Sequence, residues 1–358
     1  MPDFLLEIGT EEIPARMLDG ARTELERRLG DLLSRERLAD DALKLHAFST
    51  PRRLAVLAES VRDRQPDAEE VLQGPAVKVA FKDGAPTAAA QAFAKKAGVD
   101  LSALQRTTTP KGEYLSATVT KKGRDASAIL AETLPREIAG IYWAKSMYWR
   151  AGKPERFVRP LRWMVALLDS ETVPVEFGGV TAGNRTRGHR VLSGAELPIR
   201  RAFDYMQVMH EAKVLPDADA RRTLITQQLR AAAESRGLRV RPDDDLLTQV
   251  VNLTEYPSVV LGTFEEEYLR LPEEVLVTVM RDHQKYFAVE TPDRKLAPHF
   301  LAVLNTQAKD ATADIIVAGN ARVLRARFND ARFFWNTDQR LPLMDRGRLL
   351  ESVTFQKD

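Results

Sequence analysis

The sequence predicts an α+β protein of several domains, in which mixed or antiparallel sheets pack against helices and a small helical insertion interrupts the first domain. Three observations support this prediction. The 358 residues have room for about two or three domains of roughly 100–200 residues each. The chain opens with a strand, a helix and two strands. A mainly helical stretch near residues 202–253 then precedes a second group of strands.

The first domain, predicted over residues 1–200, opens with an apolar strand at residues 4–8. Pro14 then begins a helix, and Glu11 and Glu12 precede it, where the positive end of the helix dipole favours acidic side chains. Apolar residues recur in this helix at helical spacing and predict one buried face, made of Leu18, Ala21, Leu25, Leu29 and Leu32.

Two strands at residues 43–48 and 53–58 flank the turn Ser49-Thr50-Pro51-Arg52 and complete a β-α-β-β unit. Residues from about 67 to 111 differ, because Gly and Pro pairs punctuate an Ala-rich helix at residues 87–97 and no long strand is predicted. We therefore expect a small helical insertion there. The first domain resumes with a strand, a helix and two strands at residues 113–120, 125–138, 163–168 and 173–177.

The second domain is predicted over residues 201–345. Its predicted helices are residues 202–212, 218–235, 243–253, 272–282 and about 318–335. Its predicted strands are residues 258–261, 286–289 and 300–304. The last helix has an apolar arc formed by Ala321, Leu324, Phe328, Ala331 and Trp335. An adjoining arc suits contacts with phosphates or with acids of the same chain, and it carries Arg322, Arg325 and Arg332.

The net charge of +2 hides an uneven distribution of charge along the chain. Cations alternate with aromatic residues over residues 142–163, where the predicted RNA-binding cations are Lys145, Arg150, Arg156, Arg159 and Arg162. Further predicted RNA-binding cations are Arg185, Arg187, Arg190, Arg322 and Arg325. Residues 243–274, by contrast, are strongly acidic. Such clusters also form solvated surfaces and internal ion pairs, so the charge pattern alone leaves RNA contact open.

Composition excludes several classes of protein. The chain has no cysteine, which excludes disulfides, thiol nucleophiles, Fe–S clusters and Cys-ligated zinc. The 53 Lys and Arg against 51 Asp and Glu exclude a wholly basic, histone-like protein, and DNA is not an expected partner. No run approaches the roughly 20 apolar residues that span a bilayer. Because the start is also acidic, unlike a secretory signal, we expect a soluble cytoplasmic protein without a membrane partner.

No catalytic or metal-binding residue is predicted. The sequence lacks a P-loop, a G-x-G-x-x-G fingerprint after a strand and an H-E-x-x-H motif. Asp282 and His283 are adjacent, but one dipeptide without a second His at suitable spacing favours an ordinary polar role over metal binding. We therefore expect this chain to bind no cofactor of its own.

Eight motifs extend over nearly the whole chain: LLEIGTEEIP at 5–14, STPRRL at 49–54, FVRPLRW at 157–163, TRGHR at 186–190, LPEEV at 271–275, MRDHQKYF at 280–287, GNARVLRAR at 319–327 and DARFFW at 330–335. Together and in this order they resemble the bacterial glycyl-tRNA synthetase β subunit. One departure is IYWAKSMYW at 141–149, where that family commonly has a Pro-Lys-Lys-Met-Arg-Trp-like run. It weakens the case for any one cation there.

The resemblance implies a subunit of an α2β2 ligase that attaches glycine to tRNA(Gly). In that family the partner α subunit carries the adenylation site and uses ATP and Mg, while the β subunit binds tRNA and is needed for aminoacylation. The resemblance also implies that this chain is the N-terminal half or a truncated form of a β subunit. Residues 346–358 would then begin an HD-like domain, and the anticodon-binding domain would be missing.

Two other functions stay open. The chain is alternatively a structural module that docks the α subunit without binding tRNA, its Arg clusters pairing with the acidic residues 243–274. A hydrolytic role is the third hypothesis, in which the region around His283 belongs to an aminoacyl-tRNA editing pocket. No nucleophile with its base is visible in the sequence for that role.

Overall fold

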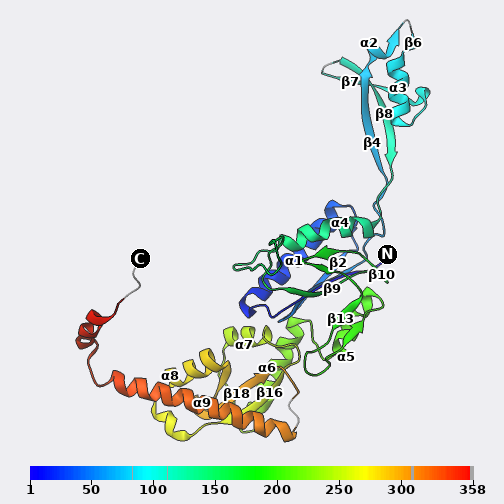
Figure 1. Ribbon diagram of the computed structural model, residues 1–358. Helices are drawn as coiled ribbons and strands as arrows, with labels where there is room; N and C mark the ends of the chain where they lie inside the picture. The colour runs from blue at the N-terminus through cyan, green and yellow to red at the C-terminus, as the bar shows by residue number, and fades with distance from the viewer. Residues whose placement is uncertain (83, 111, 308–309, 355–358) are drawn as a thin grey trace.

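The computed structural model describes residues 1–354 except 83, 111, 308 and 309. Two α+β bodies lie next to each other, and a narrow arm projects from the first body (Figure 1). The strands of both bodies and of the arm pair antiparallel with their neighbours. This confirms the predicted α+β class with several packed units.

The first body is built on a five-stranded sheet in the order β10-β9-β1-β3-β2. Its strands are β1 (Phe4–Thr10), β2 (Lys44–Thr50), β3 (Arg53–Glu59), β9 (Leu161–Leu168) and β10 (Glu171–Thr172). Central strand β1 pairs with β3 and β9, so that Leu6 lies opposite Val56 and Ala166. Every residue of β1 is buried, which requires that both faces of the sheet are covered.

Helices α1 (Ala15–Arg35) and α4 (Ala126–Ala139) cover one face of this sheet. The predicted apolar face of α1 is confirmed, since all five of its residues are buried. The other face is covered by residues 199–214, which include a 3₁₀ turn (Ala202–Asp204) and α5 (Tyr205–Glu211). The predicted boundary at residue 200 therefore lies inside a segment that packs on the first sheet.

Short strand pairs complete the first body. They are β11 (Glu176–Phe177) with β12 (Val180–Thr181), and β13 (Arg185–Arg187) with β14 (Glu196–Pro198). The predicted strand over 173–177 is wrong for residues 173–175, which belong to no strand. The backbone makes a tight turn at these residues instead of extending as a strand, because the N–H of Val175 donates a hydrogen bond to the carbonyl of Val173.

The arm interrupts the first body between β3 and α4. Its three-stranded sheet has the order β4-β8-β7, with β4 (Ala68–Ala76), β7 (Gln105–Thr109) and β8 (Gly112–Lys121). The predicted helix is confirmed as α3 (Ala88–Ala97). Smaller elements are α2 (Val77–Ala80), β5 (Phe81–Lys82), β6 (Ala85–Pro86) and a 3₁₀ turn (Leu101–Ala103). The insertion predicted at 67–111 is present with its helix, but the prediction that it has no long strand is wrong, because β4 alone has nine residues.

The second body has a four-stranded sheet in the order β15-β17-β18-β16. Its strands are β15 (Arg239–Val240), β16 (Ser258–Thr263), β17 (Tyr286–Glu290) and β18 (Leu296–Leu304). Helices α6 (Ala218–Glu234) and α7 (Asp244–Val251) pack on one face. The other face carries a 3₁₀ helix (Glu266–Arg270), α8 (Glu273–Thr278), a π-helical turn (Val279–Gln284) and α9 (Asp310–Asp338).

The apolar arc predicted for the last helix is confirmed in α9. Leu324 and Phe328 are fully buried, and Ala321, Ala331 and Trp335 pack against the same core. The helix begins at Asp310, eight residues before the predicted start. A 3₁₀ helix (Leu343–Ser352) follows it, while the last four residues of the predicted HD-like segment, 355–358, lie outside the described residues. No helix in the described part of the chain is long and apolar enough to cross a membrane.

Candidate functional site

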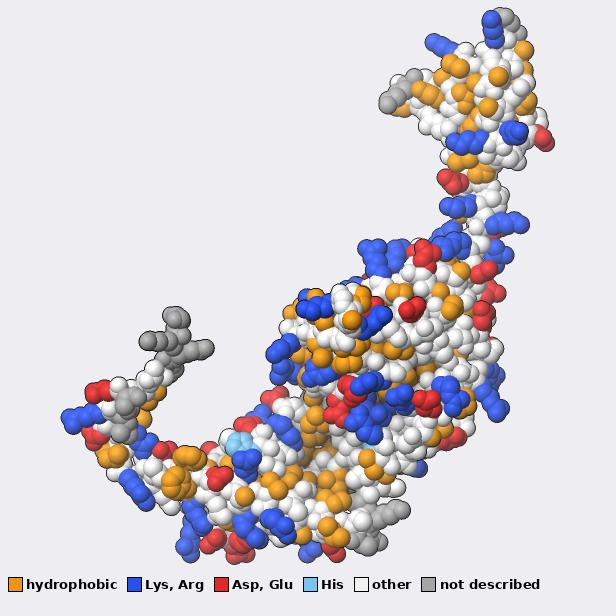
Figure 2. All heavy atoms as spheres, in the orientation of Figure 1, with side chains coloured by type: hydrophobic (Ala, Val, Ile, Leu, Met, Phe, Trp, Pro, Cys, Tyr) orange, Lys and Arg blue, Asp and Glu red, His pale blue; other side chains and the backbone are white. Residues whose placement is uncertain are grey.

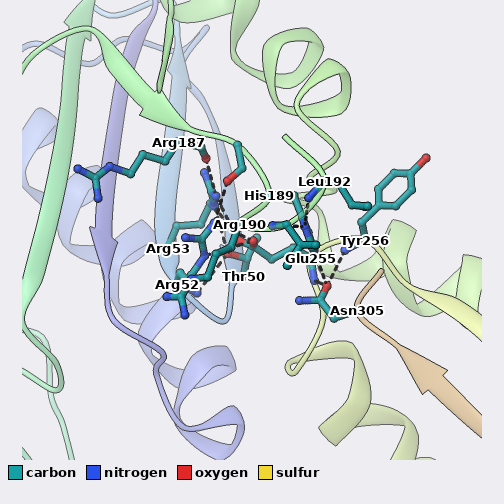
Figure 3. A network of polar contacts seen from close by, with 12 residues as sticks. Thr50, Arg52, Arg53, Arg187, His189, Arg190, Leu192, Glu255, Tyr256 and Asn305 are labelled. Carbon is teal, nitrogen blue, oxygen red and sulfur yellow. Dashed lines mark hydrogen bonds and ion pairs between the residues drawn. The ribbon is translucent and has the colours of Figure 1, made fainter. Parts of the chain in front are cut away.

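A buried ionic network joins the two bodies at the turn between β2 and β3 (Figure 3). The Nη2 atom of Arg53 lies 3.1 Å from Oε1 of Glu255, and Nη2 of Arg52 lies 3.1 Å from Oε2 of the same carboxylate. Thr50 donates its hydroxyl to Glu255 over 2.8 Å. On its other side Arg53 faces Glu7 of β1 at 3.5 Å. Arg53, Glu7 and Glu255 are all at least 98% buried.

The local fold explains how two adjacent arginines reach one carboxylate. Thr50 and Arg53 pair across β2 and β3, which leaves Pro51 and Arg52 as a tight two-residue turn at the end of the sheet. Glu255 follows α7 in the second body, and its side chain approaches the turn at this end of the first sheet from that body. The turn therefore presents two guanidinium groups and a hydroxyl to a single acid.

The electrostatics of Glu255 follow from these contacts. Burial raises the pKa of the Glu255 carboxyl, but Arg53, Arg52 and the hydrogen bond from Thr50 outweigh burial and lower it to about 2. The pKa of Arg53 is raised, because Glu255 and Glu7 together outweigh its complete burial. Both groups therefore stay charged at neutral pH. Removing either partner would leave a buried charge without compensation.

Trp163 of β9 belongs to this network and not to a free surface. Its indole Nε1 donates to Glu7, which also accepts a hydrogen bond from Thr186 over 2.6 Å. The guanidinium carbons of Arg53 and Arg187 both lie 5.4 Å from the centre of the indole. The ring packs so closely on Gly9 that a Cβ there would come within 2.0 Å of it. Gly9 is therefore needed for the ring to fit against β1.

His189 ties the loop after β13 to the second body. Its Nδ1 accepts the backbone N–H groups of Val191 and Leu192 at 3.2 and 3.1 Å, so the proton lies on Nε2. Nε2 then donates to the side-chain oxygen of Asn305 over 3.2 Å. The same oxygen accepts the backbone N–H of Glu255 over 2.7 Å. His189 thus acts as a neutral structural link next to the ionic network.

A cavity of about 450 Å³ opens beside this network, between the first and second bodies. It brings together two of the predicted RNA-binding cations, Arg159 and Arg190, with Arg52 from the β2–β3 turn. Its acidic lining residues are Glu12 and Glu255. Arg159 donates to the carbonyl of neighbouring Val158, a neutral acceptor that leaves its positive charge in place.

Most of the predicted RNA-binding cations face an acidic side chain. The ion pairs are Arg150–Glu155, Arg162–Glu11, Arg185–Glu196, Arg187–Glu196, Arg190–Glu11 and Arg325–Glu265. Among the described residues Lys145, Arg156 and Arg322 are exposed and have no ion-pair partner. The internal pairing considered for these clusters is therefore real, but only Arg325 of this set pairs with the acidic stretch 243–274.

The aromatic residues of the 142–163 stretch divide into two groups. Trp143, Phe157 and Trp163 are buried in the first body, and half-buried Trp149 packs against the same core, so these rings are not free to stack on a base. Tyr142 and Tyr148 are exposed, by 79% and 47%. In the loop between α4 and β9, Tyr142, Lys145, Tyr148 and Arg156 are exposed, as is Lys153, whose Nζ lies 5.6 Å from the centre of the Tyr148 ring.

Sequence reasoning did not assign Glu7, Arg53, Glu255 or Asn305 to any site. No spacing along the chain links them, since Arg53 is 202 residues from Glu255. The one signal in the sequence is the density of charge in the motifs around Glu7 and Arg53, within an otherwise apolar sheet. In the described part of the chain, no group of three or more acidic or His side chains is placed to bind a metal ion.

Comparisons with known proteins cover this whole architecture. The family model described as glycyl-tRNA synthetase beta subunit matches residues 4–358. The glycine–tRNA ligase beta subunit of Acidobacterium capsulatum is 59% identical over 360 residues, covering 100% of this chain and 51% of that protein. Those of Geobacter sulfurreducens and Myxococcus xanthus are 43% and 44% identical, each covering 99% of this chain and 51% and 50% of the relative. The chain spans about half the length of these relatives.

Proposed function

The chain belongs to the glycyl-tRNA synthetase beta subunit family, and we propose that it supports ATP-dependent attachment of glycine to tRNA(Gly) by binding tRNA and a catalytic α subunit. In this proposal the chain itself is non-catalytic and works in an α2β2 assembly in the cytoplasm. ATP and Mg are used by the α subunit. The chain contributes surfaces that hold the RNA.

The observation that carries the proposal is the loop between α4 and β9. There the exposed Lys145 and Arg156 have no ion-pair partner among the described residues, and Tyr142 and Tyr148 expose their rings. Unpaired cations attract phosphates, and exposed rings stack on unpaired bases. Two further arginines of the predicted set line the cavity between the bodies: Arg159, which has no ion-pair partner among the described residues, and Arg190, which is paired with Glu11.

The test is the double variant Lys145→Ala/Arg156→Ala in this chain. Binding of tRNA(Gly) is measured at several salt concentrations, and the salt slope is expected to fall by about one unit for each phosphate that the variant no longer binds. Arg230→Ala is the control, because it removes an exposed cation from the second body instead of from this loop. The Arg230 side chain is 77% exposed and lies 3.9 Å from Glu234. Unchanged affinity and slope in the folded double variant would remove this loop from the interface.

The pairing of most Arg clusters with acids supports the second candidate, a module that docks the α subunit without binding tRNA. Arg325 and Arg332 of α9 pair with Glu265 and Glu267 of their own body, as a purely architectural role requires. Size measurements with the α subunit and with tRNA separate the two candidates. If the chain binds the α subunit but does not bind tRNA, the result favours the docking module.

A further inference from the structure

The tip of the arm is more positively charged than the chain as a whole. We call residues 74–112 the arm head. It contains six Lys or Arg and two Asp, a net charge of +4, whereas the whole chain carries +2. The basic clusters near residues 145–190 are richer in arginine, but the head has few acids to offset its cations.

The cations of the arm head are exposed and unpaired. Those that the structure describes are Lys78, Lys82, Lys95, Lys96 and Arg106. None of these five makes an ion pair within the described residues; Arg106 instead lies over the ring of Phe81 at 5.4 Å. Figure 2 shows blue side chains around the head with few red ones, while red and blue are interleaved on the bodies. The head therefore retains charge that the bodies neutralise internally.

The edge strand of the head is polar on both faces. Gln105, Arg106, Thr107 and Thr108 of β7 are all exposed, although β7 pairs with β8 along one edge. Amide, hydroxyl and guanidinium groups are the donors that proteins use toward phosphate oxygens. Protein–protein interfaces, in contrast, are depleted in Lys and have an apolar centre. This edge strand therefore suits a polyanion better than another folded protein.

The head is a folded unit at the end of the arm, joined to the first body by two crossings of the chain (Figure 1). Ala80, Ala90 and Leu115 form a small core in the head, and α3 packs so closely on β4 that a Cβ at Gly74 would come within 2.5 Å of Phe93. At the base, the amide of Gln65 bonds to the carbonyl of Arg124 over 2.9 Å. A strand of nine residues reaches about 30 Å. Charge at the head is thus set apart from the charges of the two bodies.

We propose that the arm head is a second RNA-binding surface, which contacts the phosphate backbone of the tRNA at a distance from the contacts made by the bodies. This inference rests on the proposed function. It adds where on the molecule a further part of the tRNA is contacted and which chemical groups of the tRNA are recognised. The contacts are with phosphates and are independent of base sequence. Such contacts make the affinity for RNA fall as the salt concentration rises.

The test compares two variants with four substitutions each in this chain. Lys78→Ala/Lys82→Ala/Lys95→Ala/Lys96→Ala neutralises the head, and Arg230→Ala/Arg236→Ala/Arg239→Ala/Lys295→Ala removes as many exposed cations from the second body. We expect the head variant to bind tRNA(Gly) at least about tenfold more weakly at low salt, and its salt slope to fall by about one unit for each phosphate released. The control variant should change binding much less.

A second variant replaces residues 68–121 by a short Gly-Ser linker, and it should show the same loss while the bodies remain folded. Equal effects of the head and control variants, or no effect of removing the arm, would overturn the inference. So would loss of α-subunit binding with tRNA binding intact, since the head would then contact protein. If these variants bind normally while Lys145→Ala/Arg156→Ala weakens binding, the proposed function stands and the arm inference alone fails. Absence of tRNA binding by the unaltered chain would overturn both.

Discussion

The junction between the two bodies and the arm head use the same residue types in opposite ways. At the junction Arg52 and Arg53 are buried, and their charges are matched by Glu255 and Glu7. In the head, lysines and Arg106 are exposed, and no acid among the described residues pairs with them. The first arrangement fixes the two bodies to each other. The second leaves charge available to a ligand.

This difference shows that the count of cations in a segment does not reveal their role. What decides the role is whether acids are brought within reach by the fold. The 142–163 stretch lies between the two extremes, because Arg150 and Arg162 are paired while Lys145 and Arg156 are not. Three measurements of stability test whether the junction and the surface really differ as described.

The largest expected effect belongs to Arg53→Ala. It leaves Glu7 and Glu255 buried without their shared cation, and breaking a buried pair in this way costs about 3–5 kcal/mol of unfolding free energy. Urea unfolding of the variant and of the unaltered chain measures the difference. A loss below about 1 kcal/mol, the value typical of exposed pairs, would mean that the junction contributes no more than a surface contact.

Acid should weaken the same junction. The pKa of Glu255 is about 2 in the folded chain against 4.5 for the free side chain, so its contribution to stability is complete above about pH 5 and is lost as the pH falls toward 2. The expected loss is on the order of 3 kcal/mol. Unfolding measured between pH 6 and pH 2 tests it, with Glu255→Gln as the comparison. If the variant loses stability over that range as steeply as the unaltered chain, Glu255 is not the group responsible.

The smallest effect is expected for Arg162→Ala on the surface of the first body. Arg162 lies 2.6 Å from Glu11, but both side chains are partly exposed, so the pair should stabilise the fold by at most about 1 kcal/mol. The same unfolding experiment measures it. A cost close to that of Arg53→Ala would remove the distinction between junction and surface.

Much of the fold follows from local patterns in the sequence. The apolar positions of α1 and α9 repeat every three or four residues, and both faces are buried as that spacing requires. The arm was harder to predict. Its strand β4 has no buried residue and lacks alternation, and it contains Gly74 and Pro75, which usually mark a turn. The register of β4 shifts between Gln73 and Ala76, and this irregularity accommodates the two residues within a strand.

The junction could not be predicted from local patterns at all. A charged residue at the start of a strand, such as Arg53, is normally expected at the surface. Its burial depends on Glu7 and Glu255, which lie 46 and 202 residues away and approach it only once both sheets have formed. That Lys145 and Arg156 have no ion-pair partner could not be predicted from local patterns either. It depends on which acidic side chains the fold brings within ion-pair distance.

The separate core of the arm has a consequence for how this protein varies. The apolar core that joins α1 and α4 to the first sheet includes Val61 and then Ala126, and no described residue between them. The two crossings of the chain at Gln65 and Arg124 are held together by a backbone hydrogen bond. The arm can therefore be replaced at its base without removing a residue from the core of the first body. Heads of different size or charge can be exchanged there, in evolution or in the laboratory, while the first body keeps its packing.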